Sequence, residues 1–175
     1  DQGLAGDGAR GNGLAAVGGP VSYDILLYLH VIGATVLLGT GAGIAFFMVA
    51  SHRSGDPRLI AHVAGIVVRA DTVFTASAAV FQPITGVLLA REVGWPLFEG
   101  WVGLSLALYV FVGAFWLPVV WMQIRMRALA SAARDAGTPL PPEYHRLFRW
   151  WVACGFPAFS AVLAIVWLML TKPSL

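Results

Sequence analysis

The stretch YDILLYLHVIGATVLLGTGAGIAFFMVA, residues 23–50, is an apolar run with one aspartate, one histidine and no lysine or arginine. A bilayer core about 30 Å thick needs about 20 apolar residues of helix to cross it. Three further runs, at 70–90, 101–122 and 150–170, reach or nearly reach that length. We therefore predict that the protein is an all-α, four-helix transmembrane bundle.

Composition points the same way. Of the 175 residues, 58% are hydrophobic and 11% are charged, against about 25% charged residues in soluble domains. A soluble fold of this size could not hide so much apolar surface. We predict a glycine-rich N-terminal segment at 1–21 and one transmembrane domain at 22–175. Because the chain starts at Asp1, we expect a processed or truncated N-terminus. We expect either other membrane subunits or the protein's own outer surface to hold the glycine-rich segment.

The basic residues are distributed unevenly along the chain. Eight of the 11 flank or lie in two of the gaps between spans: Arg53, Arg58, Arg69, Arg125, Arg127, Arg134, Arg146 and Arg149. Cytoplasmic loops carry such an excess of basic residues. We therefore expect both arginine-rich loops in the cytoplasm, both termini outside, and a multi-pass protein of the bacterial cytoplasmic membrane in contact with the lipid bilayer. Acidic residues share these loops, which argues against nucleic-acid binding.

Arg69 and Asp71 stand at the start of the second span. The helical pattern there begins well before residue 70, so residues 59–68 are expected at the cytoplasmic interface. This lead-in places Arg69 and Asp71 near the headgroup boundary, because a charge at mid-membrane is costly. We expect Arg69 to extend its guanidinium toward the headgroups and Asp71 to pair with another helix, for example with an arginine beside the third or fourth span.

His30 is the principal candidate for chemistry, because an ionisable residue inside a membrane helix is by default a functional-site hypothesis. His30 and Gln82 each lie about eight residues from the outer end of their span, or about 12 Å below the outer edge. Tyr109 on the third span is at similar depth. A cofactor-binding cluster of His30, Gln82 and Tyr109 facing the bundle interior is therefore allowed. The alternative is a histidine that only hydrogen-bonds a neighbouring helix.

Neutral imidazole is a common axial ligand of haem iron, so His30 is also the candidate metal ligand. His52, His62 and His145 fall on the arginine-rich side, about a membrane thickness away, and their spacing matches no metal motif. A haem at His30 would then be five-coordinate, use a weaker second ligand, or bridge two copies of the chain.

Gly39 and Gly43 form a pair of small residues four apart on the first span. Such a pair allows close approach of two helices in lipid. We expect it to serve helix packing within the chain, with dimerisation through the same face as the alternative.

Several stretches carry a family resemblance: LHVIGATVLLGTGAGIAFFM, HRSGDPRLIAHVAGIVVRAD, FQPITG, and LPVVWMQIRMRALA followed by PLPPEYHRLFRWW. In them the chain resembles a bacterial family of predicted integral membrane proteins, domain of unknown function 2269, from about Asp24 to Pro173. It is more distantly similar, at Leu29, His30 and Gly33, to HemJ-type protoporphyrinogen oxidases and CopD-type copper proteins. In the HemJ group the histidine of the first span is linked to haem b binding, and this resemblance implies that role for His30.

Two hypotheses for function follow. The first is a membrane protein that binds haem b or a porphyrin near His30, for electron transfer or porphyrin redox chemistry. The second is a non-catalytic accessory subunit of a larger membrane complex. Solute transport is a weaker alternative. No phosphate loop, HExxH or GxSxG motif is present, so hydrolase or kinase chemistry of the soluble type is not expected, and we assign no enzymatic activity.

Overall fold

The computed structural model describes residues 20–174. Its elements are α1 (Pro20–Ser54), α2 (Pro57–Ala70), the π-helical turn η1 (Asp71–Thr75), α3 (Ala76–Val93), α4 (Gly100–Ala136) and α5 (Pro142–Thr171). Over these residues the chain has no strand. The four predicted spans each lie within a long helix, the second one within the continuous run α2–η1–α3, and the all-α prediction is confirmed. The expectations for residues 1–19 lie outside the described residues.

The ends of the helices follow from local chemistry. Asp56 caps α2, because its Oδ1 accepts a hydrogen bond from the Arg58 backbone N–H at 2.8 Å, and Pro57 occupies the first turn, where its missing N–H costs nothing. α4 stops at Gly137, which takes a left-handed conformation with φ of 64°. That conformation is open to glycine without a steric penalty.

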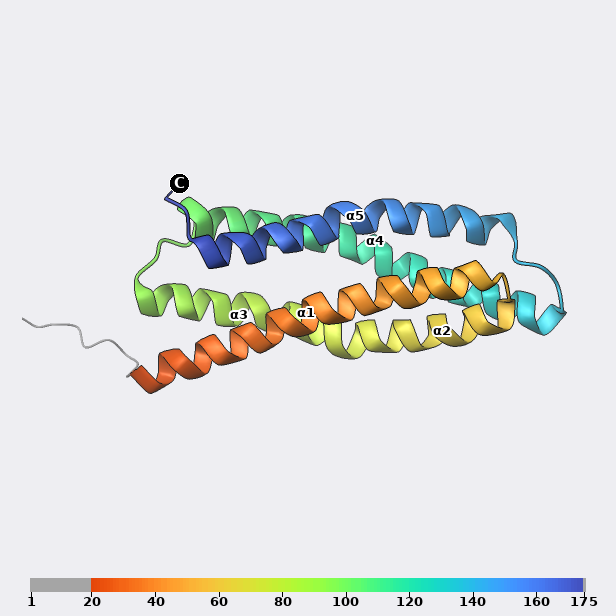
Figure 1. Cartoon of the computed structure of the whole chain (residues 1–175), viewed down its shortest axis with the longest axis horizontal. Helices are drawn as coiled ribbons and strands as arrows, with labels where there is room; N and C mark the ends of the chain where they lie inside the picture. Colours follow the sequence, from red (N-terminus) through yellow and green to blue (C-terminus); the bar gives the residue numbers. More distant parts are fainter. Residues whose placement is uncertain (1–19, 175) are drawn as a thin grey trace, which may run out of the picture.

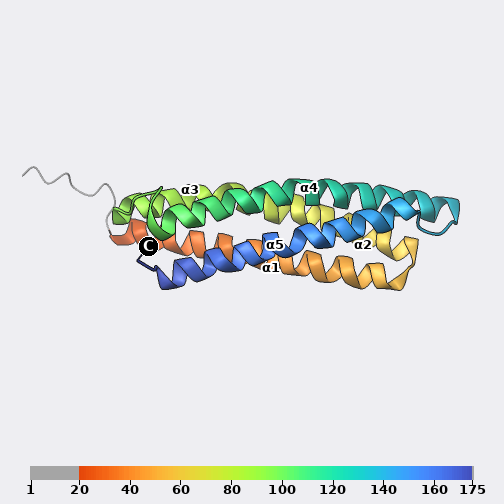
Figure 2. The same ribbon diagram turned by 90° about the horizontal axis from the view of Figure 1, so that it is seen from above.

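The helices form two antiparallel hairpins that lie side by side (Figures 1 and 2). α1 packs along α2, η1 and α3, while α4 packs along α5, and α2 joins the hairpins by packing on α4. The N-terminal end of α1 and the C-terminal end of α5 lie at one end of the bundle with the α3–α4 connection (Figure 1). The two connections that are flanked by arginines lie at the other end, which we call the arginine-rich end.

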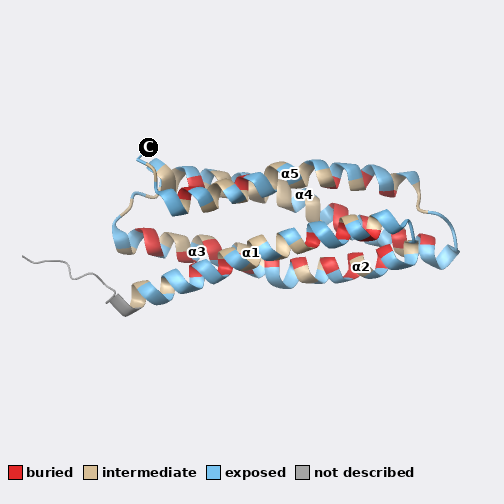
Figure 3. Ribbon diagram, in the orientation of Figure 1, coloured by how far each residue is buried: buried red, intermediate tan, exposed pale blue. Residues whose placement is uncertain are grey.

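Buried apolar side chains concentrate toward the arginine-rich end, where α1, α2, α4 and α5 meet (Figure 3). Met48, Ile60, Met126 and Tyr144 are fully inaccessible there. The outward faces are apolar as well, with Phe46, Trp167 and Leu170 among many large exposed side chains. In water such apolar faces would promote aggregation, but in a membrane lipid covers them without cost. All four long helices are apolar enough to cross a membrane, and the protein is a multi-pass integral membrane protein.

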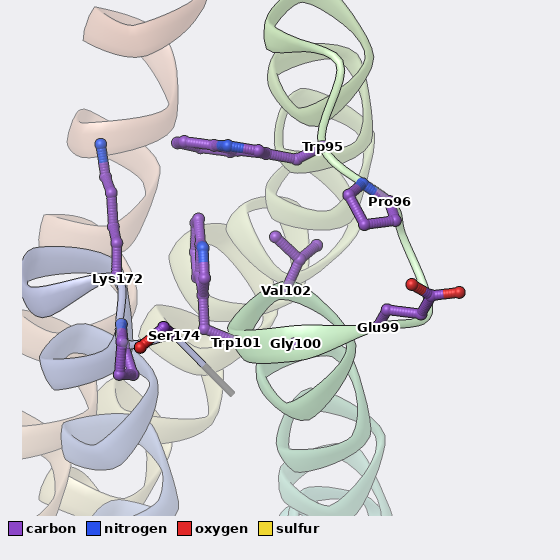
Figure 4. Close-up of a pocket in the computed structure, with 9 residues that line it drawn as sticks. Trp95, Pro96, Glu99, Gly100, Trp101, Val102, Lys172 and Ser174 are labelled. Atoms are coloured by element: carbon purple, nitrogen blue, oxygen red, sulfur yellow. The ribbon is translucent and has the colours of Figure 1, made fainter.

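Two tryptophans pack together at the end of the bundle opposite the arginine-rich end. Trp95 and Trp101 meet edge to face with ring centroids 4.8 Å apart. The Lys172 ammonium lies 4.9 Å from the centroid of the Trp95 ring, within the range of a cation–π interaction. These three side chains border a shallow pocket of about 290 Å³ (Figure 4). The contact ties the C-terminal end of α5 to the α3–α4 connection.

Candidate functional site

His30 lies buried between α1 and α3, with 8% of its surface exposed. Its Nδ1 is 2.8 Å from the Thr85 hydroxyl. That hydroxyl donates to the backbone carbonyls of Phe81 and Gln82, both at 3.1 Å. A hydroxyl has a single hydrogen, and when that hydrogen points to one of these carbonyls, the Thr85 oxygen can accept from the ring N–H of His30. We therefore assign the proton of the neutral imidazole to Nδ1, which leaves the lone pair on Nε2.

Two glycines allow α1 and α3 to approach at this point. A Cβ on Gly86 would lie 3.2 Å from His30 Cε1, and a Cβ on Gly33 would collide with the side-chain oxygen of Gln82. Gly33 and Gly86 thus place the imidazole of one helix against the backbone of the other. Thr85 and Gly86 were not predicted as site residues, although both belong to the FQPITG stretch of the family resemblance.

Gln82 joins the same cluster from α3. It is 7% exposed, and its Oε1 is buried without a hydrogen-bond partner. Buried acceptors are normally paired, so this oxygen is available to a donor that residues 20–174 do not supply. The structure therefore brings His30 and Gln82 together, as their equal depth predicted.

Tyr109 reaches α3 in a different way. Its hydroxyl donates to the backbone carbonyl of Ala79, four residues before Pro83. A proline has no N–H to donate to the carbonyl four residues earlier in a helix, so Tyr109 satisfies the group that Pro83 leaves free. Tyr109 therefore joins α4 to α3 at a backbone position, one turn from Gln82, and its hydroxyl is already occupied.

The side chains of Arg69 and Asp71 have different surroundings, one exposed and one buried. The Arg69 side chain is exposed and its Nε donates to the Gly65 carbonyl at 3.2 Å. Asp71 is buried, with 3% of its surface exposed, and Trp116 Nε1 donates to its Oδ1 at 3.3 Å. Asp71 thus faces the bundle interior, and its partner on α4 is an indole rather than the expected arginine.

The remaining histidines do not join His30. The His52 ring stacks on Phe148 with centroids 3.6 Å apart, and His145 lies edge-on at 5.8 Å, whereas His62 is exposed on α2. Within residues 20–174, no three histidine, cysteine or acidic side chains gather closely enough to hold a metal ion.

The Gly39–Gly43 pair makes no close contact inside the chain. A Cβ at Gly39 or at Gly43 would meet no atom within 4 Å. Close approach of two helices is found at Gly33 of α1, six residues before Gly39, and at Gly86 of α3.

The fold and this cluster define a polytopic α-helical membrane protein with a buried histidine–threonine pair between its first two spans. Residues 24–173 match the family model described as "Predicted integral membrane protein (DUF2269)", and the chain belongs to this family. No curated protein and no solved structure matches the chain. The distant similarity to HemJ-type and CopD-type proteins stays a prediction.

Proposed function

We propose that the chain binds a b-type haem or a porphyrin through Nε2 of His30, as a protein of the bacterial cytoplasmic membrane with its arginine-rich loops in the cytoplasm. The observation that carries the proposal is the hydrogen bond between His30 and Thr85. Metal-ligating histidines almost always donate their second ring N–H to an acceptor, which fixes the tautomer and the ring orientation. With Thr85 as that acceptor for Nδ1–H, Nε2 is the nitrogen that would hold the iron.

The donor set fits a porphyrin better than a bare metal ion. A structural or catalytic metal ion usually takes three or four protein ligands, and the described residues offer no such group. An iron porphyrin needs only one or two further ligands from protein, and one oriented imidazole meets that need. When bound, haem supplies one-electron redox chemistry. Burial of His30 keeps water away from its ring, and Gln82 of the same helix pair carries an unpaired acceptor.

The test is the absorption spectrum of the purified protein, with and without added haemin. We expect a Soret band in the wild type, its loss in His30→Ala, and its retention in His62→Ala, which removes an exposed histidine of α2. Thr85→Val leaves His30 present but removes its acceptor, so we expect haem affinity to fall about 10- to 100-fold.

A wild type that shows no Soret band after haemin titration would refute the proposal. Equal haem content in wild type and His30→Ala would refute the assignment of the ligand. Folding of each variant is checked by its melting temperature, so that lost binding is not confused with lost structure.

A second candidate is an accessory subunit of a membrane complex, and the open Gly39–Gly43 face of α1 favours it. Helix partners in membranes dock on small residues, and within residues 20–174 a Cβ added at either glycine would meet no atom within 4 Å. We expect a second subunit to co-purify in mild detergent and to be lost in Gly39→Leu. A wild type that remains a monomer when extracted directly from its native membrane would count against this role.

A further inference from the structure

Asp71 is a buried acid that the proposed haem site does not use. It is 3% exposed and opens η1, inside the continuous helical run from Pro57 to Val93. Counting along that run, Asp71 lies about 21 Å from Pro57 and about 33 Å from Val93. Ionisable side chains inside membrane helices are rare, expensive and commonly functional, and π-helical turns occur frequently at functional sites.

Both oxygens of the Asp71 carboxylate accept hydrogen bonds from neutral groups of α4. Trp116 Nε1 donates to Oδ1 at 3.3 Å. With the Gln123 amide oriented to satisfy both of its neighbours, its nitrogen donates to Oδ2 at 3.2 Å and its oxygen accepts from Trp151 Nε1 on α5 at 3.3 Å. Gln123 is 1% exposed. The ionised carboxylate is therefore held by two N–H donors, one of them backed by a third helix.

A compensating positive charge is missing from this arrangement. The ion pairs within residues 20–174 are Arg125–Glu143 and Arg134–Asp135. Arg69, the nearest base on the same run, turns to the Gly65 carbonyl, and Arg127 of α4 also packs beside Gly65. Asp71 is thus a buried carboxylate without a cation, the case in which protonation relieves the cost of a buried charge.

The other elements packed around η1 bring few titratable groups. α1 has none between His30 and His52, and α3 has none before Arg91. On α5 the Trp151 position is followed by Cys154, which is half-buried. Tyr109 of α4 is engaged with Ala79. The charge state of Asp71 is therefore governed by its own partners and by burial.

The Thr75 hydroxyl is a possible hydrogen-bond acceptor for a protonated Asp71. It ends η1, it is 8% exposed, and its hydroxyl oxygen is buried without a hydrogen-bond partner. The wide π-helical turn lets residues 71 and 75 both face inward. A protonated carboxyl carries an O–H that requires an acceptor. The Thr75 hydroxyl on the same face can accept that O–H, whereas toward the ionised carboxylate it can only donate. The site thus holds donors for the ionised form and an acceptor for the protonated form.

We propose that Asp71 is a proton-binding site that exchanges its partners on protonation. Ionised, the carboxylate accepts from Trp116 and Gln123. When one carboxylate oxygen takes up a proton from water, an O–H bond forms there, and this O–H donates to Thr75 while its bond to the α4 donor weakens. Proton binding therefore changes how η1 is held against α4.

The test is modification by dicyclohexylcarbodiimide, an apolar reagent that reacts with protonated carboxyls in apolar surroundings. The detergent-solubilised full chain is labelled at a series of pH values, and the adduct is mapped by peptide mass spectrometry. We expect Asp71 to be labelled at low pH, with the rate falling at least tenfold across the titration. A water-soluble carbodiimide should instead label the exposed Asp56.

Two variants test the exchange of partners. Trp116→Phe removes a donor to the ionised form, so the midpoint of labelling should move to higher pH. Thr75→Val removes the acceptor for the protonated form, so the midpoint should move to lower pH. Each shift corresponds to about a fivefold change in proton affinity for one hydrogen bond.

Absence of Asp71 labelling at every pH, in a sample where Asp56 is labelled by the soluble reagent, would overturn the proposal. Protection of Asp71 by sodium at constant pH would assign the site to a metal cation instead. Shifts of both variants in the same direction, or no shifts, would overturn the exchange of partners. Labelling is read on the wild type and on Trp116→Phe, so the test needs no variant of Asp71 itself, and it is independent of the Soret band.

Discussion

Replacement of Tyr109 by phenylalanine should destabilise the bundle, because one backbone carbonyl would lose its hydrogen-bond donor. Pro83 interrupts the hydrogen-bond ladder of α3 and leaves the Ala79 carbonyl without its usual N–H donor, and the Tyr109 hydroxyl donates to that carbonyl. In Tyr109→Phe the ring remains to pack but the donor is lost. An acceptor inside the bilayer then has no water to replace it.

The size of the effect can be bounded from the contact. A buried group left unsatisfied costs about 1–3 kcal/mol, while hydrogen bonds between membrane helices average about 0.6 kcal/mol and reach about 1.7 kcal/mol. We expect Tyr109→Phe to lower the free energy of unfolding by about 1 kcal/mol. Pro83→Ala restores an N–H that can bond to Ala79, so in that background Tyr109→Phe should cost almost nothing.

Equilibrium unfolding in mixed micelles, followed by circular dichroism, measures all four members of this double-mutant cycle. The expected coupling energy is about 1 kcal/mol. Pro157→Ala is the matched control, because it removes a proline within α5 whose freed carbonyl is not the Ala79 group. In the Pro157→Ala background, Tyr109→Phe should lower the free energy of unfolding as much as it does in the wild-type chain.

The reasoning would be refuted if Tyr109→Phe cost the same in the wild-type chain and in the Pro83→Ala background. It would also be refuted if Pro157→Ala suppressed the cost as fully as Pro83→Ala does. Either result would mean that Tyr109 stabilises the bundle through ring packing rather than through the carbonyl.

Two further perturbations test the packing of the helices. Gly33→Leu should destabilise the fold by about 1–3 kcal/mol, because the leucine side chain would enter the space of Gln82. Gly39→Leu should change the stability of the isolated chain by less than about 0.5 kcal/mol. Equal losses of stability for the two variants in the same unfolding assay would contradict this prediction. Arg125 holds the pKa of the Glu143 carboxyl below its usual value, so their contact stabilises the fold above that usual value and is lost as pH falls through the lowered pKa. The melting temperatures of wild type and Glu143→Gln should therefore differ near neutral pH and converge in acid, and a constant difference would exclude the ion pair as the cause.

The depth of each site residue along its helix could be predicted from residue order. Each helical residue advances 1.5 Å, so counting from the span ends placed His30 and Gln82 at one depth, and the structure brings them together. Thr85 and Gly86 escaped prediction because hydroxyls and glycines are common in membrane helices. Only the rotation of α3 about its axis, set by the contact at Gly33, turns these two residues toward the imidazole.

The amino-acid sequence by itself determined that the chain forms four membrane-crossing helices, because apolar length and the need to satisfy every backbone group in lipid leave no other solution. Tertiary structure alone decided which face of each helix meets its neighbours. Asp71 shows the difference. Its place along the second span could be predicted, but its burial against Trp116 and Gln123 depends on how α4 packs on α2 and brings these two side chains to η1. That packing buries the Asp71 carboxyl inside the bundle.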